Sequence, residues 1–301
     1  MRGRGPQTFR APKFPGPAAP APYRTRLSIL FARAAPKAVI LRRGPRTHWH
    51  LIDWDLTTDA LTPGQWMKGD VILCDLSPDG RKLIYFASQY HKPGMVWRRN
   101  VAGPFDPLAT KPIKRLRKGR KLPRYLRGAI ERATPARLDE TWTAISTPPF
   151  FSALALWPAF GRWTGGGFFE TNRTLLIGEP PERMTAIENV PFPEGIQLHS
   201  YKGLSAEELG GRFAGCRPEP PPAALVSSQR EALLAAGAQW VDFVFPRSER
   251  ELLFACDGRL CRLTGWRDVR PERYLAEAVQ VADFRDMGFT LVSPPEWAMR
   301  W

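Results

Sequence analysis

The stretch Asp75-Leu-Ser-Pro-Asp-Gly-Arg-Lys-Leu-Ile-Tyr-Phe86 decides the fold class, because it places a clear tight turn next to apolar runs. In the turn 77–80, Pro78 presets φ, Asp79 hydrogen-bonds the backbone and Gly80 accepts a positive φ. The apolar runs 71–74 and 82–87 flank this turn and are typical of strands. The sequence therefore predicts a β-hairpin here.

Further hairpins follow from the same kind of signal. Gly44-Pro45 separates the runs 38–42 and 47–55, and Asp257-Gly258 separates 251–256 from 259–263. Weaker strand signals occur at 60–62, 165–170 and 173–177. Short helices are predicted at 205–208, from Ser228 to about Gly237 and from Pro271, while 27–34 has helical spacing.

Composition supports many short elements. The 301 residues include 31 Pro and 25 Gly, which disfavours a bundle of long helices. A hydrophobic content of 43% is too high for a disordered chain. No apolar window is long enough for a membrane span and the first 30 residues lack the pattern of a secretory signal, so we expect a cytoplasmic protein.

Residues 48–88 resemble one unit of the WD-like β-propeller repeats. The resemblance rests on Leu51-Ile-Asp-Trp-Asp55 followed by the hairpin at 75–86. Closing a propeller ring takes about four or more such units. The expected fold is therefore mainly β and antiparallel, propeller-like or a divergent β-propeller, with a few short peripheral helices.

A second resemblance covers roughly residues 38–170. Its strings are Arg42-Arg-Gly-Pro45, Leu51-Ile-Asp-Trp-Asp55, Pro63-Gly-Gln-Trp66, Asp75-Leu-Ser-Pro-Asp-Gly80 and Trp142-Thr-Ala-Ile-Ser-Thr-Pro-Pro-Phe150. Together they resemble a family of bacterial proteins to which no activity is assigned. The resemblance implies that the basic stretch at about 92–140 is an insertion in this chain.

The net charge of +15 comes from 44 Lys and Arg against 29 Asp and Glu, and it is unevenly distributed. Residues 1–52 hold 11 basic residues and no acidic one, and residues 111–132 hold 10 basic residues with Glu131 alone opposing them. The remaining chain is mildly acidic. We therefore expect a disordered basic tail at 1–26 and a single mainly-β domain at 36–301, interrupted by the basic insertion.

The insertion is the best candidate for binding a polyanion such as nucleic acid, because clustered cations release counterions from phosphates. The candidate contacts are Lys111, Lys114, Arg115, Arg117, Lys118, Arg120, Lys121, Arg124 and Arg127. The alternative is a solvated loop whose charge aids solubility only.

Metal or carboxylate chemistry has one candidate cluster, at His48, His50, Asp53 and Asp55. Strand alternation puts the two His on one face and the two Asp on the other, so a metal site requires a bulge near Leu51. The structural alternative is that Asp55 and Asp59 cap a turn. No nucleotide, hydrolase or zinc-protease motif is present, and no cofactor is expected.

Aromatic residues and cysteines are the remaining candidates. Trp142, Trp157 and Trp163 either form a surface for a protein partner or pack in the core. The hairpin register predicts that Cys256 faces Arg259 and that Phe254 faces Cys261, which places both thiols on one face as diagonal neighbours. Buried reduced thiols are favoured over a disulfide.

These features predict a non-catalytic binding or scaffold protein whose basic tail and insertion contact an anionic partner. The alternative from another class is a metal- or carboxylate-dependent enzyme acting near His48, His50, Asp53 and Asp55.

Overall fold

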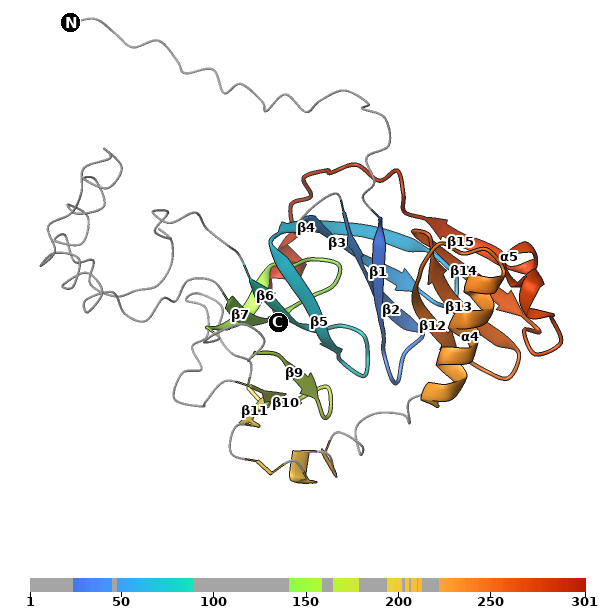
Figure 1. Cartoon of the computed structure of the whole chain (residues 1–301). Helices are drawn as coiled ribbons and strands as arrows, with labels where there is room; N and C mark the ends of the chain where they lie inside the picture. The colour runs from blue at the N-terminus through green and yellow to red at the C-terminus, as the bar shows by residue number, and fades with distance from the viewer. Residues whose placement is uncertain are drawn as a thin grey trace, which may run out of the picture.

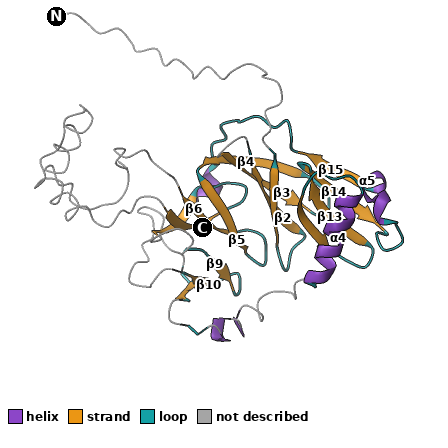
Figure 2. Cartoon of the chain, in the orientation of Figure 1, coloured by secondary structure: helices purple, strands orange, loops and turns teal. Residues whose placement is uncertain are grey.

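The computed structural model is mainly β (Figures 1 and 2). It describes the residues 24–44, 48–88, 141–158, 165–178, 194–201, 204–205, 207–209, 211–212 and 222–301. The predicted tail at 1–26 falls almost entirely outside these ranges, as do the insertion at 92–140 and its nine predicted polyanion contacts. The prediction of a mainly-β chain with a few short helices is confirmed.

Four sheets contain the strands, and three of these sheets are antiparallel meanders of four strands in chain order. Sheet A consists of β1 (Arg26–Phe31), β2 (Lys37–Arg43), β3 (His48–Asp55) and β4 (Leu61–Lys68). Sheet B consists of β5 (Asp70–Leu76), β6 (Leu83–Ser88), β7 (Thr141–Ser146) and β8 (Ala153–Pro158). Sheet D consists of β12 (Val241–Pro246), β13 (Glu251–Cys256), β14 (Arg259–Thr264) and β15 (Val279–Asp283).

Sheet C is smaller and mixed. It consists of β9 (Gly167–Phe169), β10 (Thr174–Ile177) and β11 (Gln197–Ser200), in the order β11-β10-β9. β10 is antiparallel to β9 and parallel to β11.

The predicted hairpins form as the turn residues require. In the turn at 77–80, the Ser77 hydroxyl donates to Asp79 Oδ1 at 2.7 Å, and Gly80 has φ +74°. Asp257 and Gly258 both have positive φ, which suits the tight turn between β13 and β14. Phe254 pairs with Cys261 and Cys256 with Arg259, so the predicted register is confirmed.

The helical spacing at 27–34 does not produce a helix. β1 forms instead and pairs with β2 from Arg26↔Arg43 to Phe31↔Ala38. Leu27 and Ile29 alternate into the core between sheets A and D. Tertiary burial thus outweighs the local period, and β1 forms the first strand of sheet A.

The segment that resembles a WD-like repeat does not make one sheet. Residues 48–88 supply β3 and β4 to sheet A, and β5 and β6 to sheet B. Lys68 ends β4 and Asp70 begins β5, so the boundary between the sheets is Gly69, which has φ +129°. The residues that the structure describes do not form a closed propeller ring.

The sheets stack face to face in the order D, A, B, C. Leu253 and Phe284 meet Ile40 and Trp54 in one buried cluster between sheets D and A. Sheet A uses its other face, with Leu41 and Leu51 among others, against sheet B. The outer face of sheet B then packs on Phe169 and the other buried residues of sheet C.

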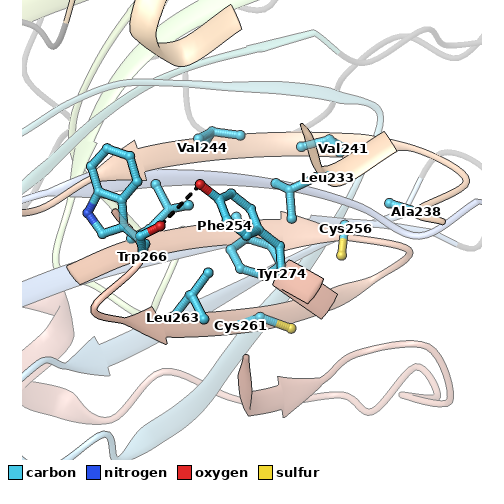
Figure 3. Packing of buried hydrophobic residues seen from close by; sticks show 11 residues of the cluster. Leu233, Ala238, Val241, Val244, Phe254, Cys256, Cys261, Leu263, Trp266 and Tyr274 are labelled. Atoms are coloured by element: carbon cyan, nitrogen blue, oxygen red, sulfur yellow. Dashed lines mark hydrogen bonds between the residues drawn. The ribbon is translucent and has the colours of Figure 1, made fainter. Parts of the chain in front are cut away.

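Two helices cover the face of sheet D that turns away from sheet A (Figures 1 and 3). They are α4 (Ala223–Ala235) and the short α5 (Tyr274–Glu277), which follows a 3-10 turn at Pro271–Arg273. Leu233 and Tyr274 pack on Phe254 and Leu263, and the Tyr274 hydroxyl donates to the carbonyl of Trp266 at 3.2 Å. The helix predicted from Ser228 therefore begins five residues earlier, although its end near Gly237 is as expected.

The first strands of neighbouring sheets lie side by side and are tied by buried carboxylates. β1 lies next to both β5 and β12, and β5 lies next to β9. Asp242 on β12 accepts the backbone N–H of Leu27, and Asp75 on β5 accepts that of Phe169, at 3.1 and 2.8 Å. Asp242 is the unpaired residue at a register shift in β12, and Asp75 directly follows the register shift in β5.

The connection between β6 and β7 starts and ends at directly paired residues. Ser88, which ends β6, is the register partner of Thr141, which begins β7. Antiparallel partners lie about 5 Å apart, so residues 89–140 leave sheet B and return to it at one point. The pairing of β6 with β7 continues without a register shift from Leu83↔Ser146 to this end.

Candidate functional site

The predicted His and Asp cluster is divided between the two faces of sheet A. On β3, Ile52 and Trp54 pack toward sheet D, whereas Leu51 packs toward sheet B. Alternation therefore puts His48 and His50 on the side of sheet D and the two Asp residues on the side of sheet B.

A bulge is present where the metal alternative requires one. The pairing of β3 with β4 shifts register between His50 and Ile52. The pairing with β2 runs without a shift from Trp49 to Asp55, so the bulge does not bring the His and Asp side chains to one face. In the described ranges, no three His, Cys, Asp or Glu side chains are grouped to hold a metal ion.

The two carboxylates have structural surroundings. Asp55 accepts the backbone N–H groups of Thr57 and Thr58 at 2.8 and 3.1 Å, which lowers its pKa and confirms its predicted role in the turn. Burial raises the pKa of Asp53, and the nearby charge of Asp55 raises it further. Asp59 has φ +58° and forms a bidentate ion pair with Arg262, at 2.6 and 2.7 Å, which joins sheet A to sheet D.

His50 is held as a neutral ring in a stack of aromatic and cationic groups. Its ring lies parallel to that of Trp66, with centroids 4.3 Å apart, and its Nε2 donates to the carbonyl of Gly64 at 3.2 Å. Nδ1 is buried without a hydrogen-bond partner. Burial, with a smaller effect from the charge of Arg42, lowers the pKa of His50 to about 4.

Arg42 is a buried cation that holds the C-terminal segment. It is 2% exposed, and its Nε and Nη2 donate to the carbonyls of Phe284 and Arg285, at 2.7 and 3.3 Å. Nη1 donates to the carbonyl of Gly44 at 2.6 Å. The guanidinium carbon lies 5.4 Å from the centre of the Trp66 ring, so Arg42, His50 and Trp66 form one layered group.

Residues 284–301, named here the C-terminal strap, continue from sheet D across sheet A to sheet B. Phe284 is buried between sheets D and A, and the Phe289 ring lies 5.7 Å from those of His48 and Trp66. Further along, the Trp297 ring lies 5.5 Å from Phe150. At the end of the strap, the ring of Trp301 lies 5.5 Å from the Lys82 ammonium and packs on the core between sheets B and C.

The strap carries most of the large apolar side chains that are exposed among the described residues. Six large apolar side chains are exposed in the described part of the chain, and four of them lie in the strap. These four are Phe289, Leu291, Trp297 and Met299. Exposed aromatic and aliphatic groups gathered along one segment are the usual mark of a surface that contacts another molecule.

The predicted tryptophan surface is not where the structure exposes aromatic rings. Trp157 is 1% exposed in the core between sheets B and C, because its position on β8 faces sheet C. Trp142 is half-buried beside the core between sheets A and B, and Trp163 lies outside the described residues. The sequence does contain a pattern that indicates the strap. Large apolar residues occur there in a Pro-containing stretch that has neither strand nor helix periodicity, namely Phe289, Leu291, Trp297 and Met299.

The fold defines a class of mainly-β protein built from stacked antiparallel meanders, with a C-terminal strap crossing them. No protein-family model, no curated protein and no solved structure matches this chain. The resemblances noted in the sequence therefore stay predictions, and function has to be argued from the geometry. Within the described residues, no helix is long and apolar enough to cross a membrane.

The lowered pKa of His50 predicts a loss of stability in mild acid. The unfolded chain takes up a proton near pH 6.5, but folded His50 does so only near pH 4, so this group favours unfolding as the pH falls between these values. His50→Phe, which keeps an aromatic ring, should remove up to about 3 kcal/mol of that acid-dependent loss. Urea unfolding at several pH values between 7 and 4 measures it.

His50→Gln serves as a second replacement that cannot titrate in this range. This variant should also lose less of its free energy of unfolding between pH 6.5 and pH 4, even if the substitution lowers the free energy of unfolding at pH 7. If the free energy of unfolding falls as steeply with acid in both variants as in the original chain, His50 does not cause the loss of stability.

Removing the buried cation should loosen the strap. Arg42→Met leaves the carbonyls of Phe284 and Gly44 without their donors, and we expect the free energy of unfolding to fall by about 2–4 kcal/mol. Limited trypsin cleavage after Arg285 should become several-fold faster. Arg43→Met, at an exposed neighbour whose guanidinium lies over Trp49, should cost less than about 1 kcal/mol. Equal effects of the two substitutions would contradict the role given to Arg42.

Proposed function

We propose that this protein is a non-catalytic binding scaffold: a propeller-like β body that carries a basic insertion for an anionic partner such as nucleic acid. The single observation that carries this proposal is the pairing of Ser88 with Thr141. A segment that leaves and re-enters a sheet at paired residues is not needed for the strand order, and such loops often carry binding residues on a rigid scaffold.

The distribution of charge along the chain supports a separate binding segment. Several arginines of the described body have partners inside the body: Arg26 pairs with Asp242, Arg33 donates to the carbonyl of Phe169, and Arg262 pairs with Asp59. Arg42 is buried. By contrast, residues 111–127 hold nine Lys and Arg and no acidic residue, a density that can neutralise several successive phosphates.

The stacking of the sheets supports a propeller-like body. Sheets A, B and D each have four strands in meander order, and the first strands β12, β1, β5 and β9 follow one another side by side. This is the way in which propeller blades are arranged around an axis. Here α4 and α5 cover the outer face of sheet D, so we propose an open arrangement of blades.

The C-terminal strap is the proposed contact for a protein partner, in place of the tryptophans suggested by the sequence. It is fixed to sheets D, A and B by Phe284, Phe289 and Trp297. A partner docked there would meet apolar side chains on a braced backbone, which lowers the entropic cost of binding. We place such a scaffold in the cytoplasm.

Excising the insertion tests the proposal most directly. A variant in which Asn-Gly joins Ser88 to Thr141 should fold with sheet B intact, because this dipeptide suits a two-residue hairpin turn. In a salt titration this variant should bind DNA and RNA more weakly than the intact chain. The slope of log K against log salt should also become shallower by several units, because each lost phosphate contact on duplex DNA accounts for about 0.9. Replacing the nine Lys and Arg of 111–127 by Gln should have the same effect.

The matched control removes exposed charges from the body. Arg250, Arg267, Arg270 and Arg273 lie on the surface of sheet D and its flanking turns, and their replacement by Gln should leave the salt slope nearly unchanged. An intact chain whose affinity does not respond to salt, or a variant without the insertion that binds as tightly as the intact chain, would refute the proposal.

A further inference from the structure

Cys256 and Cys261 form a pair of thiols at the end of the β13–β14 hairpin. Cys256 closes the turn opposite Arg259, and Cys261 lies two residues further along β14, opposite Phe254. Both side chains belong to the core under α4 and α5, where Figure 3 shows their sulfur atoms near the same end of the sheet. The twist of an antiparallel pair brings diagonal neighbours of this kind within reach of each other.

The two sulfurs interact, and each changes the other's acidity in the opposite direction. The nearness of the Cys256 thiol lowers the pKa of Cys261, and the nearness of Cys261 raises that of Cys256. The charge of Arg259 also lowers the pKa of Cys261. Both thiols are free, so the pair is present in its reduced form.

We propose that Cys256 and Cys261 are a modification site, at which a peroxide oxidises the two thiols to a disulfide across the hairpin. The thiolate of Cys261 attacks one oxygen of hydrogen peroxide, the O–O bond breaks, and Cys261 becomes a sulfenic acid while hydroxide leaves. The sulfur of Cys256 then attacks the Cys261 sulfur, its proton joins the departing hydroxide as water, and the S–S bond forms. Two thiols lose two electrons in all, and the peroxide is reduced to two waters.

The surroundings suit a small oxidant. Cys256 is 3% and Cys261 7% exposed, so a bulky disulfide reagent has little access to them and the proposed oxidant is a small neutral peroxide. The bond would join the two strands next to a turn that the positive φ values of Asp257 and Gly258 already hold closed. Oxidation is therefore expected to leave the strand register unchanged.

The sequence provides a simple readout. Arg259 lies between the two cysteines, so trypsin separates them into the peptides 251–259 and 260–262. The full-length chain is treated with hydrogen peroxide, its remaining thiols are alkylated, and the digest is analysed by mass spectrometry. We expect the two peptides to be joined, with the loss of two hydrogen atoms, and to separate again after reduction. Both peptides recovered in alkylated form would overturn the proposal.

Two variants test which sulfur is oxidised first. A control in urea tests whether the bond needs the fold or forms only because the two cysteines are close in sequence. Cys256→Ser should stop at a Cys261 sulfenic acid that dimedone traps, whereas Cys261→Ser should leave Cys256 largely alkylated. A several-fold larger share of the oxidised Cys261 should end in the joined peptides, rather than in the dimedone adduct, in the native chain than in urea, because the strands hold the thiols together. Equal shares in the two conditions would contradict the claim that the fold builds the site. Circular dichroism checks that each variant keeps its β structure.

Discussion

Burial of sheet A on both faces is the constraint on which the rest of the structure depends. On β2, five successive residues from Ala38 to Arg42 are buried, so this strand packs toward sheet D with one set of side chains and toward sheet B with the other. A one-residue shift in the register of such a strand would exchange the two sets between the two cores and disrupt the packing of both. Sheet A thereby fixes the positions of its two neighbours, and sheet C follows through sheet B. The carboxylates of Asp242 and Asp75 secure the first strands where these sheets adjoin.

Local signals allowed the hairpins of this architecture to be predicted. The turns at Ser77-Pro-Asp-Gly80 and Asp257-Gly258 determine their hairpins by backbone conformation alone, which is why even the pairing of Phe254 with Cys261 was predicted. β1 was missed because its period fits a helix and only packing against sheet D selects a strand. The stacking order could not be predicted, since it depends on contacts between residues more than 200 positions apart, such as Asp59 with Arg262.

The candidate sites show the same division. The separation of His48 and His50 from Asp53 and Asp55 followed from strand alternation and did not require a structure. Arg42 was counted only as one of the 11 basic residues of the segment 1–52, because a sequence cannot show that a guanidinium is buried among the carbonyls of residues about 240 positions away. The correction changes what the net charge of +15 means. Part of it stabilises the body, and the basic run 111–127 proposed to contact an anionic partner lies outside the described residues.

Hydrogen exchange of the native chain tests the central claim, that sheet A is the buried centre of the stack. The amides of β2 and β3, including those of Ile40 and Ile52, should exchange only through global unfolding. Their free energy of opening should therefore equal the free energy of unfolding measured by urea denaturation. The amides of β11 and β15, which lie at sheet edges and are largely exposed, should exchange with clearly lower free energies. If the amides of β2 and β3 exchange as fast as those of β11 and β15, sheet A is not the buried centre of the stack.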